Sequence, residues 1–104
     1  MKSTADVIFR TDDLEAVKAH YHGELGFAIV ADSKKLVGFD TGCFTLYFEP
    51  GDSNGTVFEF EVNEVEEAKK KLVAQGCSIV EENPGIPRCY LRDRFGLIFN
   101  LTQN

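Results

Sequence analysis

The chain contains one internal repeat, and this repeat limits its fold more than any other feature of the sequence. Each half shows one strand pattern, one helix pattern and three further strand patterns, and the halves align at an offset of about fifty residues. Residues 25–27 align with residues 75–77, and Gly42 aligns with Gly96. The repeat predicts two β-rich modules, each with a helix on one sheet face, whose other faces form a shared concave surface.

The first module is predicted over residues 5–49. Its opening strand is rich in β-branched and aromatic side chains, and an acidic cluster then marks the start of a helix. Glu15 follows Asp12 by three positions, as in a capping box. Apolar residues recur at helical spacing at Leu14, Val17, Tyr21 and Leu25. The strands of this module are expected over residues 6–10, 27–31, 36–39 and 44–49.

Turn-forming residues fill positions 50–55, which we interpret as a linker between the modules. The second module is predicted over residues 56–102, with a helix that Asn63 caps and that Gly76 ends. The buried stripe of this helix consists of Val65, Ala68 and Leu72. Its strands are expected over residues 56–62, 77–81, 88–92 and 97–101. Both modules together form one domain in this interpretation.

The composition is that of an ordinary soluble protein, with 43% hydrophobic and 27% charged residues and a formal net charge of −6. The negative charge weighs against nucleic acids and anionic membranes as partners, since both require a basic surface. No apolar run approaches the roughly 20 residues of a membrane span, and the N-terminus lacks the apolar stretch of a signal peptide. A cytoplasmic location is therefore expected.

Cysteines and basic clusters are interpreted as structural features. Cys43, Cys77 and Cys89 make an odd number without the spacing of a zinc site, and each is expected to be a small buried hydrophobic residue. Their redox state is left open. The lysine run at residues 69–71 and the arginines at Arg88, Arg92 and Arg94 are expected to be solvated charges, although the arginines also suit a phosphate or carboxylate partner.

The end of the chain carries a family resemblance. Asp93 and Gly96 supply the chemistry of a tight turn, and an apolar strand interrupted by Asn100 follows. This ending resembles that of modules in the vicinal-oxygen-chelate family, which includes glyoxalase I, fosfomycin-resistance proteins, extradiol dioxygenases and bleomycin-resistance proteins. The resemblance runs from about Asp6 to Leu101. It implies an α+β fold in which two βαβββ modules form a shared concave sheet cavity.

The resemblance also assigns four strand positions that bind a divalent metal in the metal-dependent members. Matched by motif, these positions are Asp6, Leu46, Val57 and Asn100. Leucine and valine donate no ligand atom and an amide is a weak donor, whereas divalent metals require several imidazole, carboxylate or thiolate ligands. We therefore expect no metal of the family type and no other cofactor.

Strand alternation predicts which side chains face the cavity, because residues two apart share a face. Glu61 is placed beside Val57 and Glu59 on this face, while Phe58, Phe60 and Val62 are placed against the helix. The ligand-binding residues predicted in this way are Asp6, Phe44, Leu46, Phe48, Val57, Glu59, Ile98 and Asn100. For each of them the alternative is a structural role, as a solvated strand-end acid or as part of a dimer core.

The function expected from these residues is metal-free binding of a small cationic or aromatic molecule, similar to drug sequestration by bleomycin-resistance proteins and hence to antibiotic resistance. A homodimer is also expected from the resemblance. One alternative is a glyoxalase-like, lyase-like or dioxygenase-like enzyme with a rearranged divalent-metal site. Another is a non-catalytic module of a larger assembly. No catalytic residue can be assigned from the sequence.

Overall fold

The computed structural model describes residues 1–52 and 55–104, so that Ser53 and Asn54 of the predicted linker lie outside the described residues. The chain divides into two compact units. The first unit is Ala5–Thr56, and the second consists of Val57–Asn104 together with Met1–Thr4. Both combine helices with a mixed sheet, which confirms the predicted α+β class. No helix in the two described ranges has the length and hydrophobicity that crossing a membrane requires.

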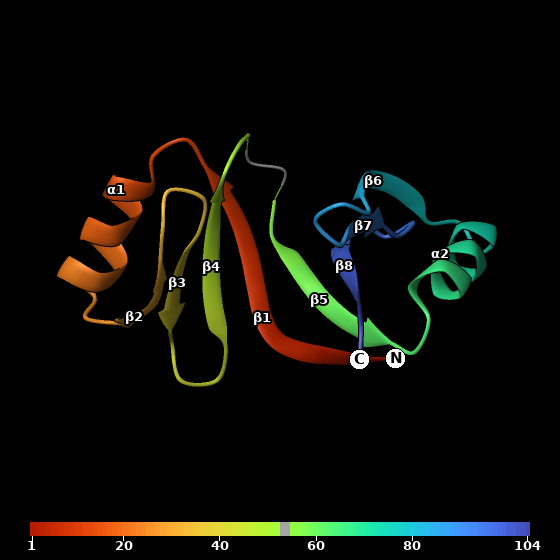
Figure 1. Ribbon diagram of the computed structural model, residues 1–104, viewed down its shortest axis with the longest axis horizontal. Coiled ribbons are helices and arrows are strands. Elements are labelled where there is room, and N and C mark those ends of the chain that lie inside the picture. Colours follow the sequence, from red (N-terminus) through yellow and green to blue (C-terminus); the bar gives the residue numbers. More distant parts are fainter. Residues whose placement is uncertain (53–54) are drawn as a thin grey trace. The chain divides into compact units, whose positions relative to one another are not determined.

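The first unit follows the predicted order of one strand, one helical segment and three more strands (Figure 1). Within it the strands are ordered β2-β3-β4-β1, with β1 and β4 parallel and the other neighbours antiparallel. The elements are β1 (Lys2–Thr11), α1 (Leu14–Lys18), the π-helical turn η1 (Ala19–Glu24), β2 (Ala28–Asp32), β3 (Val37–Asp40) and β4 (Thr45–Pro50). The first residues of β1 belong to the second unit.

The helix of the first unit starts where the acidic cluster predicts, but Asp13 rather than Asp12 caps it. The carboxylate of Asp13 accepts a hydrogen bond from the Ala16 N–H at 3.0 Å. At its end the helix widens, because the Leu25 N–H donates to the carbonyl of His20, five residues earlier, at 2.9 Å. Leu25, which follows the helical spacing of apolar residues, is 52% exposed at this end.

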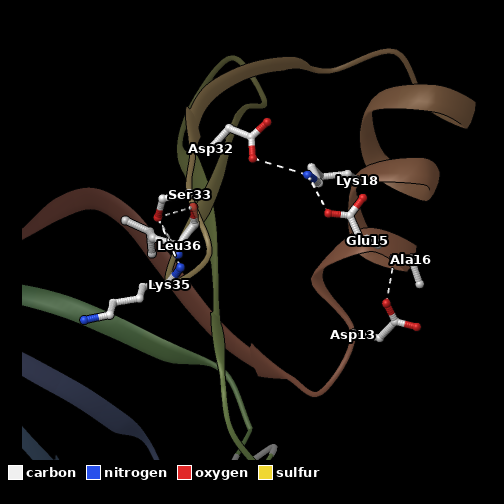
Figure 2. A network of polar contacts seen from close by, with 8 residues as sticks. All are labelled: Asp13, Glu15, Ala16, Lys18, Asp32, Ser33, Lys35 and Leu36. Atoms are coloured by element: carbon white, nitrogen blue, oxygen red, sulfur yellow. Dashed lines mark hydrogen bonds and ion pairs between the residues drawn. The ribbon is translucent and has the colours of Figure 1, made fainter.

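Lys18 ties the helix α1 to the edge strand β2. Figure 2 shows its ammonium group between two carboxylates, with Nζ 2.8 Å from Glu15 Oε1 and 3.3 Å from Asp32 Oδ1. The hydrogen bonds to Glu15 and Asp32 raise the pKa of Lys18 above its ordinary value. In the adjacent turn the hydroxyl of Ser33 accepts from the Lys35 and Leu36 N–H groups.

The second unit repeats this order of elements and this pattern of pairing. Its strands are ordered β5-β8-β7-β6, with β5 and β8 parallel and the other neighbours antiparallel. The elements are β5 (Val57–Val62), α2 (Val65–Ala74), β6 (Ser78–Asn83), β7 (Arg88–Arg92) and β8 (Ile98–Gln103). Glu64, not Asn63, occupies the N-cap position of α2, and its side chain makes no capping hydrogen bond. Instead the side chain of Gln103 accepts from the Val65 N–H at 3.3 Å.

Each unit has its own apolar core between helix and sheet. In the second unit the predicted stripe of α2 packs against strand residues as expected, and the buried centre consists of Val62, Cys89, Leu91, Phe99 and Leu101. In the first unit the helical segment packs on Val37, Phe39, Leu46 and Phe48. Aromatic rings dominate this core, since Tyr21 lies 5.1 Å from Phe48 and 5.5 Å from Phe39 between ring centroids.

The core of the first unit corrects the predicted register of β4. Val7 is paired with Leu46, and Phe9 is paired with Phe48, so these side chains share the helix-facing side of the sheet. The prediction that Leu46 and Phe48 face away from the helix is therefore wrong. The cause is the length of the preceding turn. The Thr41 N–H donates to the Phe44 carbonyl across this turn, three residues apart. In the matching turn of the second unit the Asp93 N–H donates to the Leu97 carbonyl, four residues apart, so that turn is one residue longer. Aligning the two turn glycines shifted β4 by one residue, which exchanges the faces of the strand.

Candidate functional site

A row of side chains crosses the sheet of the second unit on the face away from α2. Glu59 of β5 is paired with Asn100 of β8, Asn100 with Tyr90 of β7, and Tyr90 with Glu81 of β6. The neighbouring residues Phe60, Leu91 and Leu101 belong to the core under α2. Because side chains alternate along a strand, the row from Glu59 to Glu81 lies on the opposite face. We call these four residues the transverse row.

Asn100 is held in one orientation within this row. It is buried, its Oδ1 accepts from the Cys89 N–H at 2.9 Å, and its Nδ2 donates to Glu59 Oε2 at 3.2 Å. Both ends of the amide are thus used, which is what a buried polar group requires. A glutamate at this position would place a second carboxylate against Glu59 and would lose the amide N–H donor.

Glu59 is a half-buried carboxylate that is held by hydrogen bonds from neutral groups. Its Oε1 accepts from the Thr4 hydroxyl at 3.1 Å, and its Oε2 accepts from Asn100. Two other acids of this unit do have cationic partners: Glu61, two residues further along β5, lies 3.4 Å from Lys2 Nζ, and Glu81, at the far end of the row, lies 2.7 Å from Arg88. Among the residues that the structure describes, Glu59 has no cationic partner. Removing a charge from water without such a partner is unfavourable, so the site suits a cation.

Arg88 closes the row at its other end. Its guanidinium donates to Glu81 Oε2 at 2.7 Å and lies 5.0 Å from the centre of the Tyr90 ring. The side chain of Arg88 is only 22% exposed, so the expectation of a solvated charge is wrong at this position. Tyr90 is buried beneath it. The positive charge is thus paired with the Glu81 carboxylate, which argues against this arginine as an anion site.

The predicted ligand-binding residues fall into separate groups. In the second unit, Val57 and Ile98 are buried and paired beside the transverse row, on the same face as Glu59 and Asn100. This confirms the predicted face of all four residues. In the first unit, Asp6 is half-buried and paired with Thr45. Phe44 is 40% exposed and precedes β4, and Leu46 and Phe48 lie in the core under the helix.

Tyr47 occupies the position that the prediction gave to Leu46. Ile8 is paired with Tyr47 in the first unit as Glu59 is paired with Asn100 in the second, so Tyr47 and Asn100 are equivalent. The ring of Tyr47 lies against Gly38, where an added Cβ would come within 2.7 Å of the ring. The alignment of the two modules in the sequence matched Gly42 with Gly96, and this match placed Leu46 instead of Tyr47 at the position of Asn100. Comparing the two turn lengths could have found it.

The side chains do not form the donor set of a divalent metal. Corrected for register, the four family positions carry Asp6, Tyr47, Val57 and Asn100. Within residues 1–52 and 55–104 there is no cluster of three or more histidine, cysteine, aspartate or glutamate side chains that could hold a metal ion. Divalent metals of this kind of site need such a cluster. We therefore assign no metal ligands among the described residues.

The fold is shared with several solved structures. A glyoxalase/bleomycin resistance protein/dioxygenase superfamily member from Vibrio splendidus 12B01 is 14% identical, with 99% of this chain and 100% of that chain covered and a TM-score of 0.70. The Mn(II)-bound glyoxalase from Novosphingobium aromaticivorans is 16% identical, with 98% of this chain and 38% of that chain covered and a TM-score of 0.64. A protein from Legionella pneumophila described as NAD-dependent benzaldehyde dehydrogenase is 14% identical, with coverages of 94% and 96% and a TM-score of 0.75.

No protein-family model matches the sequence, and no curated protein matches it. The structural likeness nevertheless confirms the resemblance at the level of fold: the chain has the fold of the glyoxalase/bleomycin resistance/dioxygenase superfamily. The named activities of the neighbours differ from one another, and a fold of this kind hosts many functions. What this chain does has to be argued from its own side chains.

Proposed function

We propose that this protein binds a small cationic molecule with an aromatic or other apolar body, without a metal, and that Glu59 recognises the positive charge. The observation that carries the proposal is the half-buried carboxylate of Glu59, which is held by Thr4 and Asn100 but lacks a cationic partner among the described residues. A ligand cation would supply that partner, and charge-assisted hydrogen bonds are about twice as strong as neutral ones.

Neighbouring side chains provide contacts for the body of such a ligand. Val57 and Ile98 form an apolar pair next to Glu59 on the same face. A few placed polar groups among apolar side chains are typical of small-molecule sites. Asn100 fixes the direction of the Glu59 carboxylate and thereby the direction from which a cation approaches.

Sequestration of a drug, as in bleomycin-resistance proteins, is the biological role that we propose for this binding. It requires affinity but no catalytic group. We include a homodimer in the cytoplasm in the proposal. Light scattering of the purified protein tests the dimer independently of ligand binding.

Three compounds of nearly the same shape and different charge test the proposal. Benzamidine is cationic, benzamide is neutral and benzoate is anionic, so calorimetric titration of each into the protein isolates the contribution of charge. We expect benzamidine to bind at least about tenfold more tightly than benzamide, which corresponds to about 1.4 kcal/mol, and benzoate not to bind. Equal affinities for all three compounds would show that no carboxylate recognises the ligand.

The competing proposal is an enzyme with a divalent metal. It is motivated by the Mn(II)-bound glyoxalase among the structures that share the fold. Metal content of untagged protein, measured by mass spectrometry, and thermal shifts with Mn(II), Fe(II), Ni(II) and Zn(II) separate the two proposals. Stoichiometric metal, or a clear rise in the melting temperature with one ion, would favour the enzyme. The binding proposal predicts neither result.

A further inference from the structure

We infer that the second unit holds a further binding site, for a small apolar molecule with one ammonium group, in a cavity at the start of α2. The cavity has a volume of about 380 Å³, within the range of small-molecule pockets. It lies where the first turn of α2, the loop between β6 and β7, and the end of β8 meet. Its apolar wall consists of Val65, Pro84, Pro87, Cys89 and Leu101.

The apolar wall of this cavity is uncharged and rigid. Cys89 and Leu101 are core residues that are 4% and 2% exposed. Burial raises the pKa of the Cys89 thiol, so the thiol is uncharged at neutral pH. On the loop side, Pro84 and Pro87 have fixed backbone φ angles, and Asn83 Oδ1 accepts from the Gly85 N–H at 3.0 Å. The apolar cavity is therefore already formed before a ligand binds.

The rim of the cavity carries an excess of negative charge. Glu64, Glu66 and Glu82 line it. Lys69 bridges Glu66 and Glu82, and these two hydrogen bonds raise the pKa of Lys69, which keeps its ammonium group charged. Of the three carboxylates, the two of Glu66 and Glu82 are thus paired with this lysine. Arg88 also lines the cavity, but its guanidinium pairs with Glu81.

Glu64 is the carboxylate that remains for a ligand. It occupies the N-cap position of α2 without a capping hydrogen bond. In the described part of the chain its exposed side chain makes neither an ion pair nor a hydrogen bond, and only its backbone carbonyl is bonded, to the Ala68 N–H. An apolar cavity with one unpaired carboxylate at its edge complements an apolar body with one ammonium group.

None of the four residues of the transverse row lines this cavity. Cys89 and Leu101 point to the face of the sheet that α2 covers, whereas Glu59 and Asn100 point to the other face. The inference therefore does not depend on the proposed function, and either can fail alone. Glu59→Gln should leave binding in the cavity unchanged.

Titrations of ¹⁵N-labelled protein with cyclohexylmethylamine, cyclohexylmethanol and cyclohexanecarboxylate test the inference. We expect the amine to shift the amide signals of Val65, Cys89 and Leu101 at lower concentrations than the alcohol, and the carboxylate to have no effect. Signals of these residues that do not move with any compound would overturn the inference, as would equal affinities of the amine and the carboxylate.

Matched variants locate the charge. Glu64→Gln should weaken amine binding to that of the alcohol, a loss of about fivefold to tenfold. Glu67→Gln is the control, because Glu67 is exposed on α2, does not line the cavity and carries the same charge. Equal losses in both variants would indicate long-range attraction and contradict a site at Glu64.

Thiol protection in the unmodified protein gives a second measurement that needs no variant. Saturating amine should slow the alkylation of Cys89 by iodoacetamide by several-fold, as followed by peptide mass spectrometry. Cys43 is exposed and lies in the other unit, so its rate should stay constant. Unchanged alkylation of Cys89 would show that the amine does not occupy the cavity.

Discussion

Asn100 donates its side-chain N–H to the carboxylate of Glu59 at 3.2 Å, across the parallel pair β8 and β5. The same amide accepts from the backbone N–H of Cys89 on the next strand. Asparagine therefore joins three strands on the face where the transverse row lies. These two bonds, which a carboxylate could make only in part, explain an asparagine at this position.

Replacing Asn100 by aspartate tests this explanation. The Asn100→Asp side chain still accepts from Cys89 but faces Glu59 with a second carboxylate, so we expect a loss of about 1–3 kcal/mol in unfolding free energy at pH 7. Repulsion raises the carboxyl pKa of this pair in the folded variant. The loss of unfolding free energy is therefore complete above the raised pKa of the folded variant. It disappears as the pH falls below the carboxyl pKa of the unfolded chain, which is about 4.

Urea unfolding of the variant and the wild type between pH 4 and pH 8 measures this effect. Asn63→Asp is the control, because the Asn63 side-chain oxygen only accepts, from Asn104, and is exposed. A loss in Asn100→Asp that is the same at every pH would contradict the account.

Gly38→Ala tests the close contact between Gly38 and Tyr47. The added Cβ would lie 2.7 Å from the ring, so we expect destabilisation of about 1–3 kcal/mol from overpacking. Tyr47→Ala in the same chain should remove most of this additional cost. Gly23→Ala is the control, because a Cβ there meets no atom within 4 Å and the change should be neutral or slightly stabilising. Thermal unfolding of the variants decides between these outcomes.

The buried thiol of Cys89 predicts a fall in stability at alkaline pH. Desolvation raises its pKa in the folded state above the ordinary thiol value of 9.0. A raised folded pKa means that its contribution is complete below the unfolded pKa and is lost as the pH rises through the folded pKa. Unfolding free energies measured from pH 7 to pH 11 should fall less steeply for Cys89→Ala than for the wild type. Parallel curves would show that Cys89 does not titrate in this way.

Lys69 and Lys70 should respond differently to the same substitution. Lys69 pairs with Glu66 and Glu82 and thereby links α2 to β6, whereas Lys70 is exposed. Lys69→Gln should lower the melting temperature by a few degrees at most, since solvent and salt screen such pairs, and Lys70→Gln should leave it unchanged. The difference should shrink at 1 M salt. A difference that is independent of salt would contradict the role of charge.

The sequence predicts the order of elements well, because strand and helix periodicities are local. The stripe of Val65, Ala68 and Leu72 and the two faces of β5 and β8 lie as the periodicity predicts. The predicted register of β4 was wrong because the strand carries apolar residues on both faces. The alternation of side chains therefore could not reveal that the turn before β4 is one residue shorter than the turn before β8. Local pattern thus identifies a strand but not its register.

Residues whose roles depend on distant partners were predicted poorly. Arg88 and Lys69 follow the charge pattern of solvated residues, and only the fold brings Glu81 and Glu82 beside them. Cys43 was expected to be buried because of its apolar neighbours, but it is exposed in the turn before β4. The cavity at α2 combines residues from widely separated segments, which no motif in the sequence joins.

Binding of benzamidine to Glu59→Gln, measured beside the wild type by calorimetry, tests the central claim most directly. Glutamine keeps the size of the side chain and can still accept from Thr4 or Asn100, but it lacks the charge. We predict at least about a tenfold loss of affinity in Glu59→Gln and no loss in the exposed control Glu67→Gln. Unchanged affinity in Glu59→Gln, with the fold intact, would show that this carboxylate does not bind the ligand.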